Sequence, residues 1–142
     1  MEEQLKIILA DDNKTFLVGL QFILNKNFNC EFIDICNNGN ELVQSPFLSQ
    51  SDLVITDISM PEINGVEAAK RINVKYSTLP MIAITMHLEN IYLHEIVCAG
   101  FKGFVYKPDV SKNLTNVVHQ VLRKQFVFPD NLKIDKYSGG VL

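Results

Sequence analysis

The chain has 142 residues, 47% of them hydrophobic, which predicts one domain with a sizeable core. Its net charge of −3 and isoelectric point near 5.5 argue against binding nucleic acid through bulk positive charge. No apolar stretch reaches the roughly 20 residues that span a membrane, and the acidic start does not resemble a signal peptide. We therefore expect a cytoplasmic protein with no membrane contact and no direct nucleic-acid binding, and its three cysteines, in no metal-binding pattern, fit a reducing compartment.

Five short apolar runs alternate along the chain with segments of helical period. The runs cover residues 5–10, 30–36, 52–56, 80–84 and 103–106. The first, third and fourth are almost wholly apolar, as strands covered on both faces are, whereas the second alternates and suits an edge. This alternation predicts an α/β domain of (βα)5 type, with a five-stranded parallel sheet that is doubly wound by helices.

The segments between and after these runs carry apolar residues at helical spacing. Helices are predicted from about 14 to 26, from about 38 until Pro46, after Asn64-Gly65, from about 89 to 99 with Gly100 as C-cap, and after Ser111 as N-cap. From residue 127 onward the composition changes. We expect residues 1–126 to form the domain and 127–142 to be a linker or tail toward an output domain that this chain lacks.

Four of the apolar runs end in polar residues that carry chemistry. Asp11 and Asp12 follow the first run, Asp57 the third, Thr85 the fourth and Lys107 the fifth. Open α/β folds bind ligands at the carboxyl edge of the sheet, so these side chains are expected to converge. Adjacent carboxylates are costly to bury unless a cation neutralises them, and Mg²⁺ prefers carboxylates together with waters and phosphate oxygens.

This set of side chains is suited to receiving a phosphoryl group. Asp57 can act as the nucleophile and form an aspartyl phosphate, with Mg²⁺ shielding its charge from the incoming phosphate. The Thr85 hydroxyl can donate to a phosphate oxygen, and Lys107 can pair with Asp57 at rest and with phosphate afterwards. Each residue alone is more often a turn, cap or surface residue, so the prediction rests on their joint order.

At these residues the chain resembles the receiver domain of two-component response regulators, of the NarL/FixJ-type branch of LuxR-family regulators. The resemblance covers about residues 4–126 and is carried by four segments: Ile8-Leu9-Ala10-Asp11-Asp12-Asn13, Val18-Gly19-Leu20, Asp57 to Glu67, and Ala99 to Pro108. It implies a flavodoxin-like strand order of 2-1-3-4-5. It also implies a cis peptide bond between Lys107 and Pro108.

The resemblance assigns the phosphorylation and metal sites residue by residue. Asp57 would be the phosphoacceptor, and Lys107 would contact the phosphoryl group. Asp12 would bind Mg²⁺ directly and Asp11 largely through water. Asp57 and the backbone carbonyl of Ser59 would complete the metal ligands.

It also implies a conformational switch. Thr85 would contact the phosphoryl group, and Phe104 would turn inward when Thr85 moves toward it. Ser59 and His87 lie two residues beyond Asp57 and Thr85, at positions where the family tunes the lifetime of the phosphoryl group.

The implied function is Mg²⁺-dependent signalling. A sensor histidine kinase would supply the phosphoryl group, and the surface of the fourth helix, fifth strand and fifth helix would recruit a partner, often a second copy. Transcription would be regulated through a DNA-binding domain absent from this chain. The chain would catalyse only its own phosphorylation and dephosphorylation, and would not be an enzyme acting on other substrates.

Three alternatives remain open. A receiver-like interaction module that is never phosphorylated usually lacks an acidic residue or the lysine, and this chain retains them all. A phosphatase with an aspartyl nucleophile needs a second Asp two residues later, where Ser59 stands. A flavodoxin-like cofactor binder needs a phosphate-binding loop after the first strand, where Asp11 and Asp12 would repel phosphate without a metal.

Overall fold

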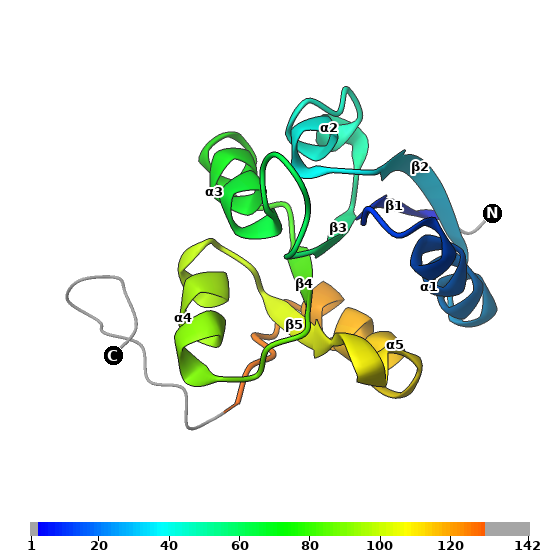
Figure 1. Ribbon diagram of the computed structural model, residues 1–142. Coiled ribbons are helices and arrows are strands. Elements are labelled where there is room, and N and C mark those ends of the chain that lie inside the picture. The colour runs from blue at the N-terminus through cyan, green and yellow to red at the C-terminus, as the bar shows by residue number, and fades with distance from the viewer. Residues whose placement is uncertain (1–2, 130–142) are drawn as a thin grey trace.

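A computed structural model describes residues 3–129, and in it a parallel sheet lies between two layers of helices (Figure 1). The strands are β1 (Leu5–Ala10), β2 (Cys30–Cys36), β3 (Leu53–Asp57), β4 (Met81–Thr85) and β5 (Gly103–Tyr106). Their order is β2-β1-β3-β4-β5, and each neighbouring pair is parallel. The α/β class, the flavodoxin-like strand order and the five strands expected from the sequence are confirmed.

Five helices connect and follow the strands. They are α1 (Lys14–Asn27), α2 (Gly39–Val43), α3 (Gly65–Lys75), α4 (Asn90–Cys98) and α5 (Val110–Leu122), with 3₁₀ turns at Leu48–Gln50 and Lys107–Asp109. The side chains of Asn13, Asn38 and Asn64 cap α1, α2 and α3, each accepting a hydrogen bond from the backbone N–H three residues later. Gly100 follows α4 with a positive φ of 101°, the conformation in which glycine ends helices. Within residues 3–129, none of the helices has both the length and the apolar composition required to cross a membrane.

Two expectations about the start of α5 are wrong. The helix begins at Val110 after the 3₁₀ turn, so Ser111 lies inside its first turn and does not cap it. The bond between Lys107 and Pro108 is trans, as are all peptide bonds of the described residues. The chain winds directly from β5 into the 3₁₀ turn, where the fixed φ of Pro108 fits and its missing N–H costs nothing.

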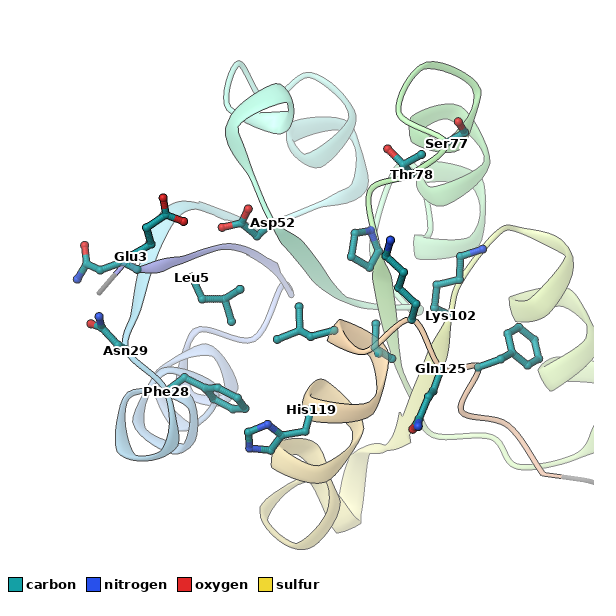
Figure 2. A pocket seen from close by; sticks show the side chains of 16 residues that line it. Glu3, Leu5, Phe28, Asn29, Asp52, Ser77, Thr78, Lys102, His119 and Gln125 are labelled. Atoms are coloured by element: carbon teal, nitrogen blue, oxygen red, sulfur yellow. The ribbon is translucent and has the colours of Figure 1, made fainter. Parts of the chain in front are cut away.

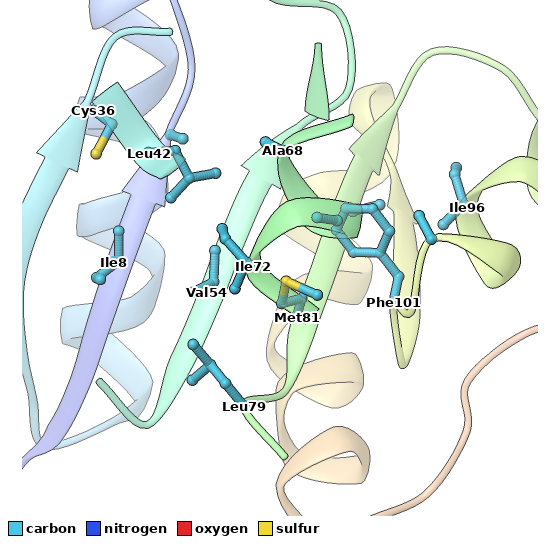
Figure 3. Packing of buried hydrophobic residues seen from close by; sticks show 14 of the residues in the cluster. Ile8, Cys36, Leu42, Val54, Ala68, Ile72, Leu79, Met81, Ile96 and Phe101 are labelled. Carbon is cyan, nitrogen blue, oxygen red and sulfur yellow. The ribbon is translucent and has the colours of Figure 1, made fainter. Parts of the chain in front are cut away.

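The sheet is buried on both faces because successive residues of a strand point to opposite sides. In β1, Ile7 and Leu9 belong to the core cluster that contains residues of α1 and α5, whereas Ile8 and Ala10 belong to the cluster that contains residues of α2, α3 and α4. Figure 3 shows the second of these clusters, in which residues of the strands meet Leu42 of α2 and residues of α3 and α4. Fully burying one such aliphatic side chain stabilises the fold by about 1.5–3 kcal/mol.

Close backbone packing at two glycines holds the loop between β3 and α3. The Gly65 N–H donates to the Ile58 carbonyl at 2.8 Å, and a methyl group on Gly65 would overlap the Asp57 carbonyl oxygen. A methyl group on Gly39 of α2 would likewise overlap the Ile63 carbonyl oxygen. Packing at both glycines thereby fixes the path of the chain directly after Asp57.

We expect Gly65→Ala to lower the free energy of unfolding by about 1–3 kcal/mol, because the added methyl group forces the backbone at the end of β3 to shift. Urea unfolding measures the change. Gly19→Ala is the matched control, since Gly19 lies on α1 with no atom within 4 Å of an added methyl group. It should instead stabilise the protein by about 0.5–1 kcal/mol. Equal effects of the two substitutions would contradict the close packing at Gly65.

Candidate functional site

The predicted polar residues meet at the carboxyl edge of the sheet. Asp11 directly follows β1, Asp57 ends β3, Thr85 ends β4 and Lys107 directly follows β5. The sheet register places Asp57 beside the residue that precedes Thr85, and Thr85 beside the residue that precedes Lys107. Four strands thus deliver these side chains to one end of the sheet.

Three carboxylates form the centre of this site. Asp11, Asp12 and Asp57 each place one carboxylate oxygen within 4.8 Å of the others. Asp11 and Asp57 are buried, with 0% and 5% of their surface exposed, whereas Asp12 is open to solvent. The N–H of Asn13 donates to Asp11 Oδ1 at 2.8 Å and fixes that carboxylate. Clustered carboxylate oxygens with one open side are the donors that Mg²⁺ prefers.

The Lys107 ammonium bridges the two buried carboxylates. Its Nζ atom lies 3.0 Å from Asp11 Oδ2 and 3.4 Å from Asp57 Oδ2, so the shorter contact is with Asp11. The ring of Phe16, from the first turn of α1, lies 4.4 Å from the same Nζ atom and adds a cation–π contact. The ammonium is therefore held from three sides.

Burial and charge shift the pKa values of both partners. Burial, and then the nearby charge of Asp11, raise the pKa of Asp57 above its usual range, although Lys107 and the Ile58 N–H oppose the shift. Burial disfavours the charged form of Lys107, but its hydrogen bond to Asp11 and the charge of Asp57 outweigh this and raise its pKa. One ammonium thus faces three carboxylates, and the site favours a further cation.

The Thr85 hydroxyl is engaged in the loop between β4 and α4. It accepts from the His87 N–H at 3.0 Å and donates to the His87 carbonyl at 3.3 Å. The exposed His87 ring stacks on Tyr92 of α4 at 4.4 Å and lies 3.8 Å from the Glu89 carboxylate. Any movement of the Thr85 hydroxyl toward a ligand must therefore break bonds that shape this loop.

The other two predicted residues lie around this centre. Ser59 is exposed in the loop after β3, two residues beyond Asp57. Phe104 of β5 is partly buried, and its ring stacks on Phe128 with 5.3 Å between centroids.

Sequence reasoning missed two contacts at the site. The spacing of apolar residues placed Phe16 on the buried face of the first helix, and its position four residues after Asp12 was the available signal for its contact with Lys107. Phe128 was assigned to the segment beyond the domain, because no periodic pattern connects it with Phe104.

A hollow lies elsewhere, at the amino ends of the strands (Figure 2). It measures about 1040 Å³ and is lined by Leu5, Phe28, Asp52, Lys102 and His119, among others. None of the carboxylates of the cluster lines it. The carboxylate cluster at the carboxyl edge is therefore separate from this hollow.

Comparison with known proteins identifies the family. Residues 7–119 match the family model of the response regulator receiver domain, and the chain belongs to this family. It is 30% identical over 129 residues to the transcriptional regulatory protein YdfI of Bacillus subtilis, covering 90% of this chain and 60% of YdfI. It is also 30% identical over 120 residues to the oxygen regulatory protein NreC of Staphylococcus carnosus, covering 84% of this chain and 55% of NreC. The chain thus spans little more than half the length of these relatives.

Solved structures agree with the fold. The response regulator RcsB of Salmonella typhimurium superposes with a TM-score of 0.81 at 20% identity, over 91% of this chain and 65% of that chain. The receiver domain of the putative response regulator NarL of Mycobacterium tuberculosis superposes with a TM-score of 0.78 at 18% identity, over 87% of this chain and 100% of the NarL chain. Receiver domains are signalling domains of two-component systems, and phosphorylation and Mg²⁺ binding at an acidic pocket are typical of the family.

In the presence of a chelator, we expect Asp57→Asn to raise the free energy of unfolding at neutral pH. The pKa of Asp57 is raised in the folded state, so the stability associated with its neutral carboxyl is present below the ordinary Asp pKa and is lost as pH rises through the raised value. Urea unfolding across acidic to neutral pH should show the difference from wild type narrowing as pH falls. The exposed Asp12→Asn is the control and should change stability less. Equal stability of Asp57→Asn and wild type at neutral pH would contradict the raised pKa.

Proposed function

We propose that this chain is a phosphorylation-controlled switch in which Asp57 accepts a phosphoryl group from a sensor histidine kinase. The observation that carries this proposal is the bridge from Lys107 to the buried carboxylates of Asp57 and Asp11. A buried carboxylate beside a fixed cation and a group of metal-binding oxygens has the surroundings that a phosphoryl acceptor needs.

The donor set fits Mg²⁺. Asp12 is open to solvent and would bind the ion directly, together with Asp57 and the backbone carbonyl of Ser59. Asp11 already holds Lys107 and the Asn13 N–H, which supports its proposed contact with the ion through water. Bound Mg²⁺ would neutralise the carboxylates and stabilise charge on the phosphoryl oxygens.

Transfer proceeds by attack of an Asp57 oxygen on phosphorus, in line with the bond that breaks. The new O–P bond forms as the P–N bond of the kinase phosphohistidine breaks, and the imidazole nitrogen leaves with the electron pair and takes up a proton. Lys107, only 3.4 Å from Asp57 Oδ2 at rest, pairs with a phosphoryl oxygen afterwards. Phe16 and Asp11 hold the ammonium in place for this step.

The phosphoryl group then changes the loop between β4 and α4. Thr85 gives up its two bonds to His87 and donates to the phosphoryl group, and Phe104 turns inward. Ser59 and His87, two residues beyond Asp57 and Thr85, are the residues that we propose tune the lifetime of the phosphorylated state.

The output surface is formed by α4, β5 and α5. Large apolar side chains are exposed on and before α4: Met86, Leu88, Ile91 and Tyr92. They support recruitment of a partner here, and we propose a second copy of the chain. We further propose that residues 1–126 act as the receiver and 127–142 lead to a DNA-binding domain outside this chain, since relatives such as YdfI are transcriptional regulatory proteins.

The first experiment is intact mass after incubation with a small acyl phosphate, with and without Mg²⁺. Asp57 is the proposed nucleophile, and the three clustered carboxylates need a cation to neutralise them. We therefore expect the wild-type protein to gain one phosphoryl group only when Mg²⁺ is present, and Asp57→Ala to gain none. No gain, together with no affinity for Mg²⁺, would instead indicate an interaction module that is never phosphorylated.

Phe16→Leu should slow this phosphorylation by about 2- to 5-fold, because it removes a cation–π contact with Lys107 worth on the order of 0.5–1 kcal/mol. Phe16→Tyr keeps an aromatic ring and should retain the wild-type rate. The matched control is Phe22→Leu, which removes a ring from the same helix where 70% of the side chain is exposed. Equal rates for Phe16→Leu and wild type would show that the ring does not position the ammonium.

A further inference from the structure

The five residues 125–129, here called the strap, return from the end of α5 to the free edge of the sheet (Figure 1, orange). The chain reverses at Lys124, whose φ is +64°, and the Gln125 N–H bonds back to the Gln120 carbonyl at 3.0 Å. The Val127 N–H then donates to the Lys102 carbonyl at 2.8 Å. Val127 also forms a parallel bridge with Gly103 at the start of β5. The strap therefore pairs with this edge of the sheet at one residue, as an isolated bridge.

A missing side chain on β5 makes room for the strap. A methyl group on Gly103 would lie 3.2 Å from the Cβ atom of Val127 and 3.1 Å from a methyl group of Val121. Contacts this short are tighter than ordinary van der Waals packing. The glycine thus permits both α5 and the strap to pack closely against the same point of β5.

The strap also covers Phe104, the residue that the proposed function turns inward. The ring of Phe128 stacks on that of Phe104 at 5.3 Å, with 27° between the planes. The ring of Phe126 packs in turn on Phe128 at 4.7 Å. An aromatic pair depends on the relative position of both rings, so this contact exists for one orientation of Phe104 and is lost for another.

The place where the strap docks belongs to the proposed output surface. Phe128 lines a hollow of about 370 Å³ together with Leu88, Phe104, Asn113 and Val117, which come from β5, α5 and the loop before α4. A partner that binds α4, β5 and α5 meets the strap on this surface. The strap therefore forms part of the wall of this hollow and covers part of the proposed output surface.

The strap is attached lightly. Val127 is bridged to the sheet at a single residue, Gly103, and Phe126 remains 49% exposed. Segments with few ladder hydrogen bonds and half-exposed side chains open at low free energy. This suits a segment that leaves and returns while the domain stays folded.

We propose that the strap is an intramolecular ligand of the output surface, docked while the ring of Phe104 stacks on Phe128 and released when phosphorylation turns Phe104 away from that stack. The inference rests on the proposed function and assigns the chain's own segment as the competitor of the partner. Because the strap contacts only one of the two states, it favours the unphosphorylated state, and phosphorylation must weaken its docking by the same factor.

Hydrogen exchange of the full chain tests the release. The Val127 amide is protected by its bond to Lys102, and we expect phosphorylation to speed its exchange by about 10-fold. Intact mass of the same sample reports how much Asp57 is phosphorylated. If the protein is phosphorylated and the exchange rate of the Val127 amide does not change, the proposed release of the strap is wrong, whereas the proposed function still holds. A protein that takes up no phosphoryl group would overturn the proposed function, and the strap with it.

Phe128→Ala tests the reciprocal effect. Losing the ring stack on Phe104 removes a contact specific to the unphosphorylated state, so phosphorylation by an acyl phosphate should be faster by about 2- to 10-fold. Phe126→Ala is the matched control, because among the described residues its ring stacks only on Phe128. It should change the rate less. A Phe128→Ala rate equal to that of wild type would contradict the coupling.

Discussion

The site depends on two carboxylates that share one ammonium below the protein surface. Asp11 and Asp57 are both buried, and each raises the electrostatic cost of the other's charge. Lys107 lowers this cost, but a single positive charge cannot satisfy two buried carboxylates and the exposed Asp12 beside them. The remaining imbalance of charge favours a further cation beside these carboxylates.

The fold makes this arrangement possible by burying the strands from both sides. Alternate residues of β1 belong to the core clusters on the two faces of the sheet. A shift of the strand by one residue would move each side chain to the opposite face, so the register of the strand is fixed. Gly65 adds a close backbone contact directly behind Asp57. The loop after Thr85 is held instead by two hydroxyl hydrogen bonds and a stacked histidine at the surface. Close backbone packing thus places Asp57, whereas side-chain contacts at the surface hold the loop after Thr85.

The positions of the short apolar runs predicted the strands closely, since parallel strands that are buried on both faces are almost wholly apolar. The same runs predicted that the polar residues at their ends lie together at the carboxyl edge of the sheet, because parallel strands all run in one direction. The shorter contact of Lys107 with Asp11 could not be predicted, since it depends on register and side-chain torsions. The start of α5 was missed because the 3₁₀ turn, with Pro108 near its start, supplies an earlier beginning than Ser111.

The strap shows how a segment without periodic pattern can still belong to the folded surface. Residues past 126 lack helical or strand spacing over any useful length, yet Val127 pairs with Gly103 and Phe128 covers Phe104. An exposed sheet edge is a template for pairing with another chain, and covering it with the chain's own segment is one way to block such pairing. If Phe104 controls whether that cover stays, the edge is blocked at rest and opened on phosphorylation. The residue that senses the phosphoryl group would then also decide when the output surface becomes available.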